Sequence, residues 1–185
     1  RRSATLRDLA DFTRLIDALE QADVMHAMVI PQDISQVGFD RILFSTIFQN
    51  SSKHYYSQGQ GGQSVRDQVE MAAVLQGEVA EVKKAPWFSF VVCFNSPLVH
   101  SSERVQEMIE CARFNIPIWL EPSNMMGATA PITIAGALVE HLVNALTGLV
   151  LMQTLNPGHP CILAVASGGF NMRNGTYVAA SPEAV

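Results

Sequence analysis

The chain has 185 residues, with 12 Lys and Arg against 17 Asp and Glu, so its formal charge is −5 when the five His are neutral. Hydrophobic residues make up 48% of the chain and charged residues 16%. This composition excludes a disordered tail and supplies enough apolar side chains for a sizeable core in a single domain. The few basic residues are scattered rather than aligned, so nucleic acid is not an expected partner.

The three cysteines, Cys93, Cys111 and Cys161, are odd in number and form no CxxC pair. They indicate neither a disulfide framework nor a zinc site, and they are typical of reduced thiols in the cytoplasm. The first thirty residues contain no basic leader followed by an apolar stretch, so no signal peptide is visible. Because the chain starts without Met, we expect it to be part of a longer protein.

The first predicted element is a helix that starts after Thr5, a possible N-cap, because apolar residues recur at helical spacing from Leu9 to Leu19. A short apolar run over residues 26–30 predicts a strand, which Pro31 closes, and helical spacing returns over residues 39–48. The same alternation continues along the chain. Further strands are predicted at 53–57, 88–95, 116–121 and 161–167, and further helices at 65–75, 102–114 and 131–155.

Strands that alternate with helices need crossover connections, which place neighbouring strands parallel and cover the sheet with helices. The predicted class is therefore α/β. The strands at 88–94 and 161–166 are apolar at nearly every position, as expected of strands buried on both faces. An open doubly wound sheet and a (β/α)8 barrel both provide that environment, and the periodicity leaves both open. Five units are too few to close an eight-stranded barrel.

The helix predicted at 131–155 has clear start and stop signals. Thr129 is its expected N-cap, Pro131 is tolerated in its first turn, and Asn156-Pro157-Gly158 ends it. Its apolar residues repeat at steps of three and four and predict a stripe that packs on the core. The stripe consists of Ile134, Leu138, Leu142, Ala145, Leu149 and Met152.

The same helix resembles a membrane span in its apolar composition, but Glu140, His141 and Asn144 lie at its centre. One charged side chain there costs about 2.5 to 3.5 kcal/mol on the insertion scale. We therefore expect a buried helix of a soluble protein with no membrane contact. Glu140 and His141 are expected to form a hydrogen-bonded pair in the core.

In a parallel α/β fold the functional site is built from the loops that follow the carboxyl ends of the strands. None of these loops has a GxSxG, GxGxxG or GxxxxGK[ST] motif, and the five His show no HxH or HExxH spacing. Nucleotide chemistry and metal catalysis are therefore not expected. The loops are 31–33, 57–58, 95–97, 121–129 and 167–169, and the run QGQGGQ at 58–63 is expected to be flexible.

Glu121 is the most informative polar residue in these loops. Strand alternation over 116–121 places Trp119 and Glu121 on one face, so an acid lies near an indole and the pair can receive a cation. The alternative is a Glu exposed at the rim, above a Trp packed under a helix.

Other aromatic residues at loop edges can line a cage for a quaternary ammonium group, worth about 0.5 to 2 kcal/mol per contact, although each is more often part of a core. They are Tyr55, Tyr56, Trp87, Phe94 and Phe170. In addition, the small residues of the segment 125–131 allow a ligand to approach the backbone at the start of the long helix.

Four stretches of the sequence carry a resemblance to a known family. The longest is MGATAPITIAGALVEHLVNALTGLVLMQTLNPGHPCILA at 126–164. The others are FNSPL at 94–98, IPIWLEP at 116–122 and MRNG…SPE at 172–183, in the same order and spacing. Together they extend over nearly the whole chain and resemble the trimethylamine methyltransferase family, which includes betaine-demethylating relatives.

The resemblance implies a (β/α)8 barrel, of which residues 1–185 hold about five βα units, with N-terminal and C-terminal portions missing. The implied activity moves a methyl group from trimethylamine, or from a quaternary amine such as glycine betaine, to the cobalt of a corrinoid (cobalamin). A partner protein carries this corrinoid, so no cofactor is bound directly. In some members pyrrolysine occupies a barrel position further along than these residues.

We expect the substrate pocket to lie at the carboxyl ends of the strands, with catalytic residues not identified. Trp119 and Glu121 are expected to stabilise the cationic head of the substrate. The predicted pocket residues are Asn95, Trp119, Glu121, Met126, Gly127 and Thr129.

Two alternatives to an active enzyme stay open. Many family members place Glu where this chain has Asn144 and Asp where it has Asn171, and the lost charges are compatible with a protein that binds quaternary ammonium ligands without transferring methyl groups. The second alternative is that these 185 residues alone are inactive. An incomplete barrel exposes two sheet edges, which also favours association of copies into homo-oligomers.

Overall fold

The computed structural model describes residues 2–95 and 97–178. Ser96 and the SPE motif at 181–183 lie outside these ranges. The helices are α1 (Leu6–Ala18), α2 (Phe39–Asn50), α3 (Gly61–Gln76), α4 (Val79–Lys84), α5 (Ser102–Phe114) and α6 (Ile134–Leu155). The strands are β1 (Val24–Met25), β2 (His54–Ser57), β3 (Phe88–Phe94), β4 (Ile118–Pro122), β5 (Met125–Met126), β6 (Cys161–Leu163), β7 (Gly168–Asn171) and β8 (Thr176–Val178).

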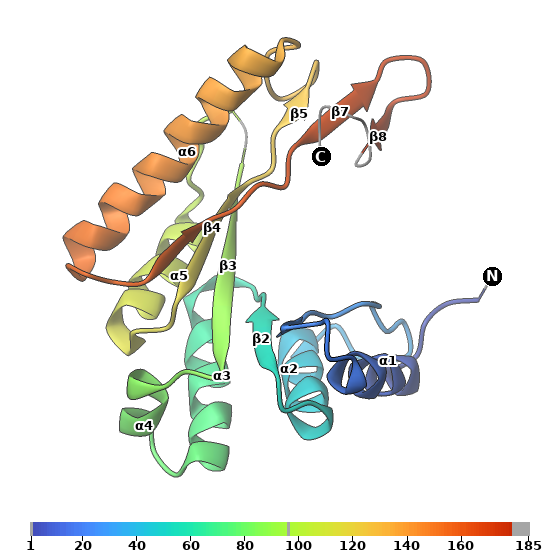
Figure 1. Cartoon of the computed structure of the whole chain (residues 1–185), viewed down its shortest axis with the longest axis vertical. Coiled ribbons are helices and arrows are strands. Elements are labelled where there is room, and N and C mark those ends of the chain that lie inside the picture. Colours follow the sequence, from blue (N-terminus) through green and yellow to red (C-terminus); the bar gives the residue numbers. More distant parts are fainter. Residues whose placement is uncertain (1, 96, 179–185) are drawn as a thin grey trace.

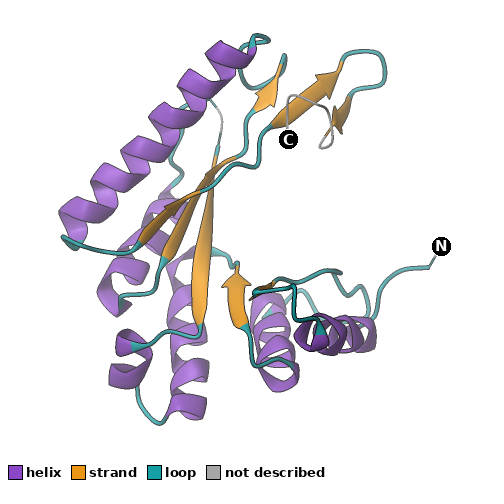
Figure 2. Cartoon of the chain, in the orientation of Figure 1, coloured by secondary structure: helices purple, strands orange, loops and turns teal. Residues whose placement is uncertain are grey.

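Five strands form one parallel sheet in the order β1-β2-β3-β4-β6. The order follows the chain without reversing, and the helices lie on the outside of the curved sheet, leaving its inner face open (Figures 1 and 2). A doubly wound sheet reverses direction at a switch point and has helices on both faces. The α/β prediction is therefore confirmed, and the described residues have the one-directional arrangement of consecutive barrel units.

The outer face of the sheet carries the hydrophobic core. Phe88, Phe90 and Val92 of β3 are fully buried, as are Ile118 and Leu120 of β4. These side chains alternate with residues that point to the inner face, because successive residues of a strand face opposite sides. The helices α3, α5 and α6 cover this outer face (Figure 1).

The first helix begins as predicted. Thr5 is its N-cap, since the Thr5 hydroxyl accepts the Asp8 N–H at 3.3 Å and the Asp8 carboxylate accepts the Thr5 N–H at 2.7 Å. The strand predicted at 26–30 is wrong, because the ladder contains only Val24 and Met25. After Met25 the Tyr56 carbonyl pairs with Nδ1 of the His26 ring at 3.2 Å, and the backbone leaves the sheet.

The glycine-rich run at 58–63 is a loop only over residues 58–60. Helix α3 starts within it at Gly61, and the Gly61 N–H donates to Glu107 Oε1 at 2.8 Å. Glu107 is fully buried and pairs with Arg104 at 2.7 Å, and Arg104 also donates to the Gly59 carbonyl at 3.4 Å. An ion pair on α5 with a buried carboxylate therefore fixes this segment, which composition alone does not reveal.

Helix α6 starts later than predicted. Thr133 is the N-cap, with its hydroxyl accepting the Gly136 N–H at 3.3 Å, so Pro131 precedes the helix. The predicted cap, Thr129, instead accepts the Met125 N–H at 3.0 Å inside a tight turn that Gly127 supports with φ +84°. The stop at Asn156 is confirmed.

The predicted buried stripe of α6 is only partly right. Leu138 and Leu142 are about half exposed, at 53% and 49%. The helix approaches the sheet through small side chains, since a Cβ on Gly148 would lie 2.7 Å from the Phe94 ring, and large residues do not fit there. The residues that face the sheet are Ala137, His141, Asn144, Ala145, Gly148 and Met152.

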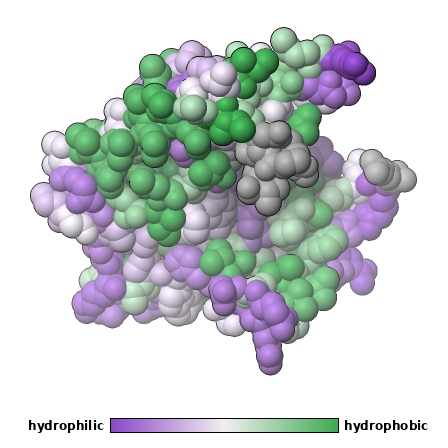
Figure 3. Space-filling model, turned by 45° about the horizontal axis from the view of Figure 1, so that its top comes forward, coloured by the Kyte–Doolittle hydropathy of each residue, from purple (hydrophilic) through white to green (hydrophobic). Residues whose placement is uncertain are grey.

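The outward side of α6 is consequently apolar, and Figure 3 shows hydrophobic residues gathered over this part of the molecule. By length and composition α6 is apolar enough to cross a membrane. In this fold it lies along β4 and β6 as one of the helices that cover the sheet. The predicted pair with Glu140 is wrong, because His141 Nδ1 lies 3.3 Å from the Ser167 hydroxyl and Glu140 Oε1 has no partner in the described ranges.

A second, small sheet was not predicted. Strand β5 pairs in parallel with β7, and β7 turns back on β8 as an antiparallel hairpin. Gly168 is required where the two strands meet, since a Cβ there would lie 2.6 Å from the Val178 carbonyl oxygen. This sheet stands beyond the carboxyl ends of β4 and β6 (Figure 1).

Candidate functional site

A row of polar and aromatic side chains crosses the inner face of the sheet. Parallel pairing aligns Tyr56 of β2 with Ser89 of β3, and Cys93 of β3 with Glu121 of β4. Trp119 lies two residues before Glu121 and shares its face. Three neighbouring strands therefore bring Tyr56, Ser89, Cys93, Trp119 and Glu121 together, and we call these five residues the inner-face cluster.

Glu121 is the centre of the cluster and is half-buried. The Tyr56 hydroxyl donates to Glu121 Oε2 at 2.9 Å. The Cys93 thiol lies 3.5 Å from the same oxygen, as a second and weaker donor. The carboxylate is therefore held in place by groups from two other strands rather than free at a rim.

Trp119 is fixed in a similar way. Its indole N–H donates to the Ser89 hydroxyl at 2.7 Å, and His54 Nε2 lies 2.9 Å from that same hydroxyl. The Tyr56 ring meets the Trp119 ring edge-on, with centroids 5.1 Å apart, and meets the His26 ring at 4.9 Å. The prediction that Trp119 and Glu121 share a face is confirmed, and the structure adds Tyr56 as their link.

The ionisable groups around Glu121 stay protonated. Burial, and next the negative charge of Glu121, raise the pKa of the Tyr56 hydroxyl well above its usual value. The same two causes raise the pKa of Cys93 to about 11. Both groups therefore act as hydrogen-bond donors, and Cys93 is not a reactive thiolate near neutral pH.

The inner-face cluster has the groups needed to bind an organic cation. A carboxylate supplies the charge, and the faces of Trp119 and Tyr56 attract a cation that has no hydrogen to donate. Within residues 2–95 and 97–178, Glu121 forms no ion pair with Lys or Arg. Its negative charge is thus not already neutralised by the part of the chain that the structure describes.

Four other predicted pocket residues lie elsewhere. Asn95 forms a bridge with Val99 just after β3. Met126, Gly127 and Thr129 belong to β5 and the tight turn after it. No described hydrogen bond joins these four residues to Glu121 or Trp119, so their place in a pocket stays a prediction.

The predicted aromatic cage does not form as one group. Tyr55 and Phe94 are buried in the core, on the opposite face from Tyr56. Trp87 lies before the amino-terminal end of β3, and Phe170 lies in β7. Strand alternation over HYYS at 54–57 places Tyr55 and Tyr56 on opposite faces of the sheet. It does not tell which of the two faces the helices cover.

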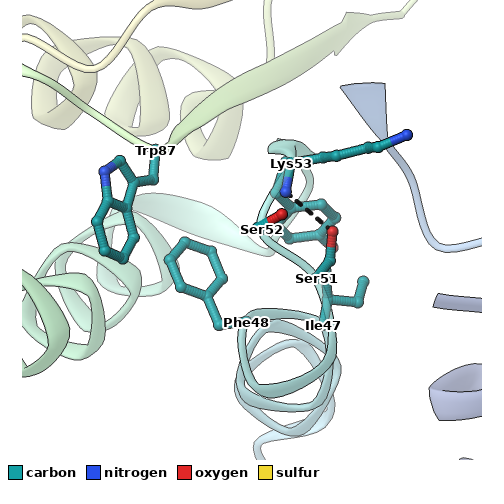
Figure 4. Close-up of a pocket in the computed structure, with 7 residues that line it drawn as sticks. Ile47, Phe48, Ser51, Ser52, Lys53 and Trp87 are labelled. Atoms are coloured by element: carbon teal, nitrogen blue, oxygen red, sulfur yellow. Dashed lines mark hydrogen bonds between the residues drawn. The ribbon is translucent and has the colours of Figure 1, made fainter. Parts of the chain in front are cut away.

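A cavity of about 440 Å3 lies at the opposite end of the sheet, by the start of β2 (Figure 4). Its lining residues are Ile47, Phe48, Ser51, Ser52, Lys53, Tyr55 and Trp87. The Lys53 ammonium points away from Phe48 and Trp87 and donates to carbonyls at the end of α1, those of Ile16, Leu19 and Ala22. Lys53 therefore caps α1 and offers no charge to a ligand in this cavity.

A smaller cavity of about 170 Å3 lies at the carboxyl end of β2, and His26 and Asp40 are among the residues that line it. The His26 ring also meets the Tyr56 ring, so this cavity adjoins the inner-face cluster. The described residues contain no cluster of three or more His, Cys, Asp or Glu placed to hold a metal ion.

Comparison with known proteins decides the family. The sequence model of the family described as "Trimethylamine methyltransferase (MTTB)" matches residues 1–185. The chain belongs to the trimethylamine methyltransferase family. It is thus part of a family of methyltransferase enzymes, as the four sequence stretches indicate.

Relatives with two different named substrates match nearly the whole chain. A trimethylamine methyltransferase of Desulfitobacterium hafniense (strain DSM 10664 / DCB-2) is 35% identical over 182 residues, 98% of this chain and 37% of that protein. One from Methanosarcina barkeri is 33% identical over 181 residues, 96% of this chain and 36% of that protein. A glycine betaine methyltransferase of Desulfitobacterium hafniense (strain Y51) is 30% identical over 185 residues, 99% of this chain and 38% of that protein. The chain therefore spans less than two-fifths of the length of these relatives.

Asn144 and Asn171 are the two positions where the resemblance implies a charged residue in many family members. Asn144 faces the sheet at 1% exposure, and neither atom of its amide has a hydrogen-bond partner in the described ranges. Asn171 accepts the Arg173 N–H at 3.0 Å within the β7–β8 hairpin. Neither residue contacts the inner-face cluster through a described hydrogen bond.

Proposed function

We propose that the complete protein containing these residues transfers a methyl group from a methylated amine to the cobalt of a corrinoid held by a partner protein. Its sheet would then be part of a (β/α)8 barrel whose interior is the inner face described above. The observation that supports this assignment is the inner-face cluster, where a carboxylate and two aromatic rings converge near the carboxyl ends of the strands. Family membership supports the reaction class.

The methyl group moves without the electrons of its bond to nitrogen, and the acceptor supplies the electron pair of the new bond to carbon. The acceptor attacks the methyl carbon in line with the carbon–nitrogen bond, and that bond breaks with its electrons staying on nitrogen. A quaternary amine then leaves as a neutral tertiary amine. The nitrogen of a quaternary or protonated donor therefore carries a full positive charge when it binds and loses it as the methyl group departs.

This change of charge defines what Glu121 can contribute. A fixed carboxylate stabilises the bound cation more than a transition state in which the positive charge is falling. Glu121 and Trp119 are thus binding and orienting groups, which hold the donor so that one methyl group faces the acceptor. Loss of the charge should therefore mainly raise KM and change kcat little, because the bound donor loses more stabilisation than the transition state.

The test is Glu121→Gln in the complete protein, assayed with its reduced corrinoid partner and a methylated amine. Removing the charge from a partly desolvated cation site is expected to raise KM about tenfold or more. Glu103→Gln is the matched control, because Glu103 is exposed on α5 and its loss changes the net charge equally. An unchanged KM in Glu121→Gln contradicts the assigned role.

The same assay separates the enzyme from a binding protein. Methyl transfer that requires the corrinoid partner supports the proposal. Tight binding of a quaternary amine with no transfer under reducing conditions contradicts it and indicates a protein that only binds such ligands. The charges that the family resemblance implies at positions 144 and 171, where this chain has Asn, motivate a test of this second outcome.

A further inference from the structure

We infer that Tyr56 is a specificity-determining residue, which holds Glu121 so that the site disfavours methylammonium donors that carry a carboxylate of their own. The inference rests on the proposed function in one respect, because it assumes that the ligand is a methylated ammonium ion. It concerns binding selectivity, and methyl transfer can be measured separately.

The two oxygens of the Glu121 carboxylate differ in their contacts. Tyr56 and Cys93 both approach Oε2, at 2.9 Å and 3.5 Å. In the described ranges no group donates to Oε1. One oxygen therefore anchors the side chain, and the other keeps its full capacity to face a ligand.

Tyr56 is itself held in one orientation. Its ring forms T-shaped pairs with the Trp119 ring and the His26 ring, at interplanar angles of 78° and 75°. His26 also pairs with the Tyr56 carbonyl at 3.2 Å. Because the Tyr56 ring is held in place, its hydroxyl holds the hydrogen-bonded Glu121 carboxylate, and therefore its negative charge, in one position.

Within the described ranges, Glu121 is the acidic member of the cluster. Two basic residues of the surrounding elements, Lys53 and Arg104, already have partners. Lys53 donates to backbone carbonyls of the α1 end, and Arg104 pairs with the buried Glu107. The described residues thus place an unneutralised carboxylate at the site and no free cation beside it.

Such a site treats two kinds of quaternary amine differently. A donor without a carboxylate gains attraction to Glu121 and to the aromatic rings. In glycine betaine one carbon atom separates the ammonium nitrogen from a carboxylate carbon, so the second negative charge comes within a few ångströms of Glu121. Like charges at that separation repel strongly in a half-buried environment.

The test compares tetramethylammonium with glycine betaine by calorimetric titration of the complete protein. Both probes are permanently charged at nitrogen, so their head groups do not change with pH. We expect the wild-type protein to bind tetramethylammonium about tenfold more tightly or better. Tyr56→Phe keeps the ring but removes the donor, so Glu121 can turn away and the ratio should fall to about threefold or less.

A matched control and a second variant keep the test decisive. Tyr177→Phe removes a tyrosine hydroxyl in the β7–β8 hairpin and should leave the ratio unchanged. If Tyr56→Phe does not fold in thermal unfolding, Cys93→Ala removes the weaker donor and should lower the ratio by a smaller factor. Equal binding of the two probes by the wild type, or an unchanged ratio in both variants, overturns the inference.

The outcomes for binding and for catalysis are distinguishable. Methyl transfer with no selectivity between the probes overturns the role of Tyr56 and leaves the proposed function in place. Selectivity that depends on Tyr56, with no methyl transfer to the corrinoid partner, supports the inference and contradicts the proposed function.

Discussion

The two faces of β3 and β4 use the same strands for opposite purposes. On the outer face, Phe90 and Leu120 are fully buried under helices and are purely apolar. On the inner face, Ser89, Trp119 and Glu121 take part in hydrogen bonds that extend across three strands. Neighbouring residues in the sequence therefore serve stability or binding according to which side of the sheet they face.

Substitutions on the two faces should therefore have different effects. Outer-face changes remove packing that the helices cannot replace, so they should lower the free energy of unfolding. Inner-face changes remove polar contacts that position a ligand, and they should alter affinity more than stability. The following predictions test that division, and each refers to the complete protein.

The largest effect is expected for Phe90→Ala on the outer face. It empties the centre of the core and should reduce the free energy of unfolding by about 3 to 5 kcal/mol. Phe12→Ala on α1 is the control, because Phe12 is 43% exposed and should cost much less. Urea denaturation measures both, and equal costs would show that the outer face is not the core.

Gly148→Ala should have the next largest effect, through overpacking. The added Cβ would lie 2.7 Å from the Phe94 ring and 3.2 Å from Leu120 Cδ2. Pushing α6 off the sheet should cost about 1 to 3 kcal/mol in unfolding free energy. Thr147→Ala, one residue earlier and exposed, should change stability by less than about 0.5 kcal/mol. Unchanged stability in Gly148→Ala would contradict the close approach of α6 to the sheet.

Ser89→Ala tests the inner face directly. The Ser89 hydroxyl serves both Trp119 and His54, so its loss leaves two polar groups without this partner. We expect a stability loss of about 1 to 2 kcal/mol and weaker binding of tetramethylammonium. Ser102→Ala on the exposed start of α5 is the control. If affinity is unaffected while stability falls, Ser89 only supports the fold.

The smallest effect is a pH dependence of stability. Burial lowers the pKa of His54 in the folded chain below its usual value. As the pH falls through the ordinary histidine pKa of 6.5, the His54 imidazole is protonated in the unfolded chain before it is protonated in the folded chain. The free energy of unfolding therefore decreases as the pH falls. His100, His141 and His159 shift in the same direction for the same reason. The free energy of unfolding should be smaller at about pH 5.5 than at about pH 7.5, and His54→Gln should reduce this difference. An unchanged difference in His54→Gln contradicts the contribution assigned to His54.

Much of the fold is predictable because local signals and tertiary packing agree. The capping box at Thr5, the apolar run at 88–94 and the stop at Asn156 are each decided within a few residues. Predictions fail where a distant partner decides the outcome. The segment 58–63 is fixed by Glu107 on α5, and the buried side of α6 is chosen by its approach to Phe94.

The candidate site divides in the same way. Alternation along β4 is sufficient to predict that Trp119 and Glu121 share one face. The contributions of Tyr56 and Cys93 depend on parallel register between strands that are far apart in the sequence. No spacing rule within one strand reports that register, so the residues that hold Glu121 were not predicted as a group.

The α/β class, most helices and strands, and the family can be predicted from the sequence, because periodicity, caps and motifs are properties of short segments. Three features become known only from the three-dimensional arrangement: the face of the sheet that the helices cover, the buried side of α6, and the donors that hold the Glu121 carboxylate. They depend on packing and register between distant strands, where the closest fit of side chains selects one arrangement.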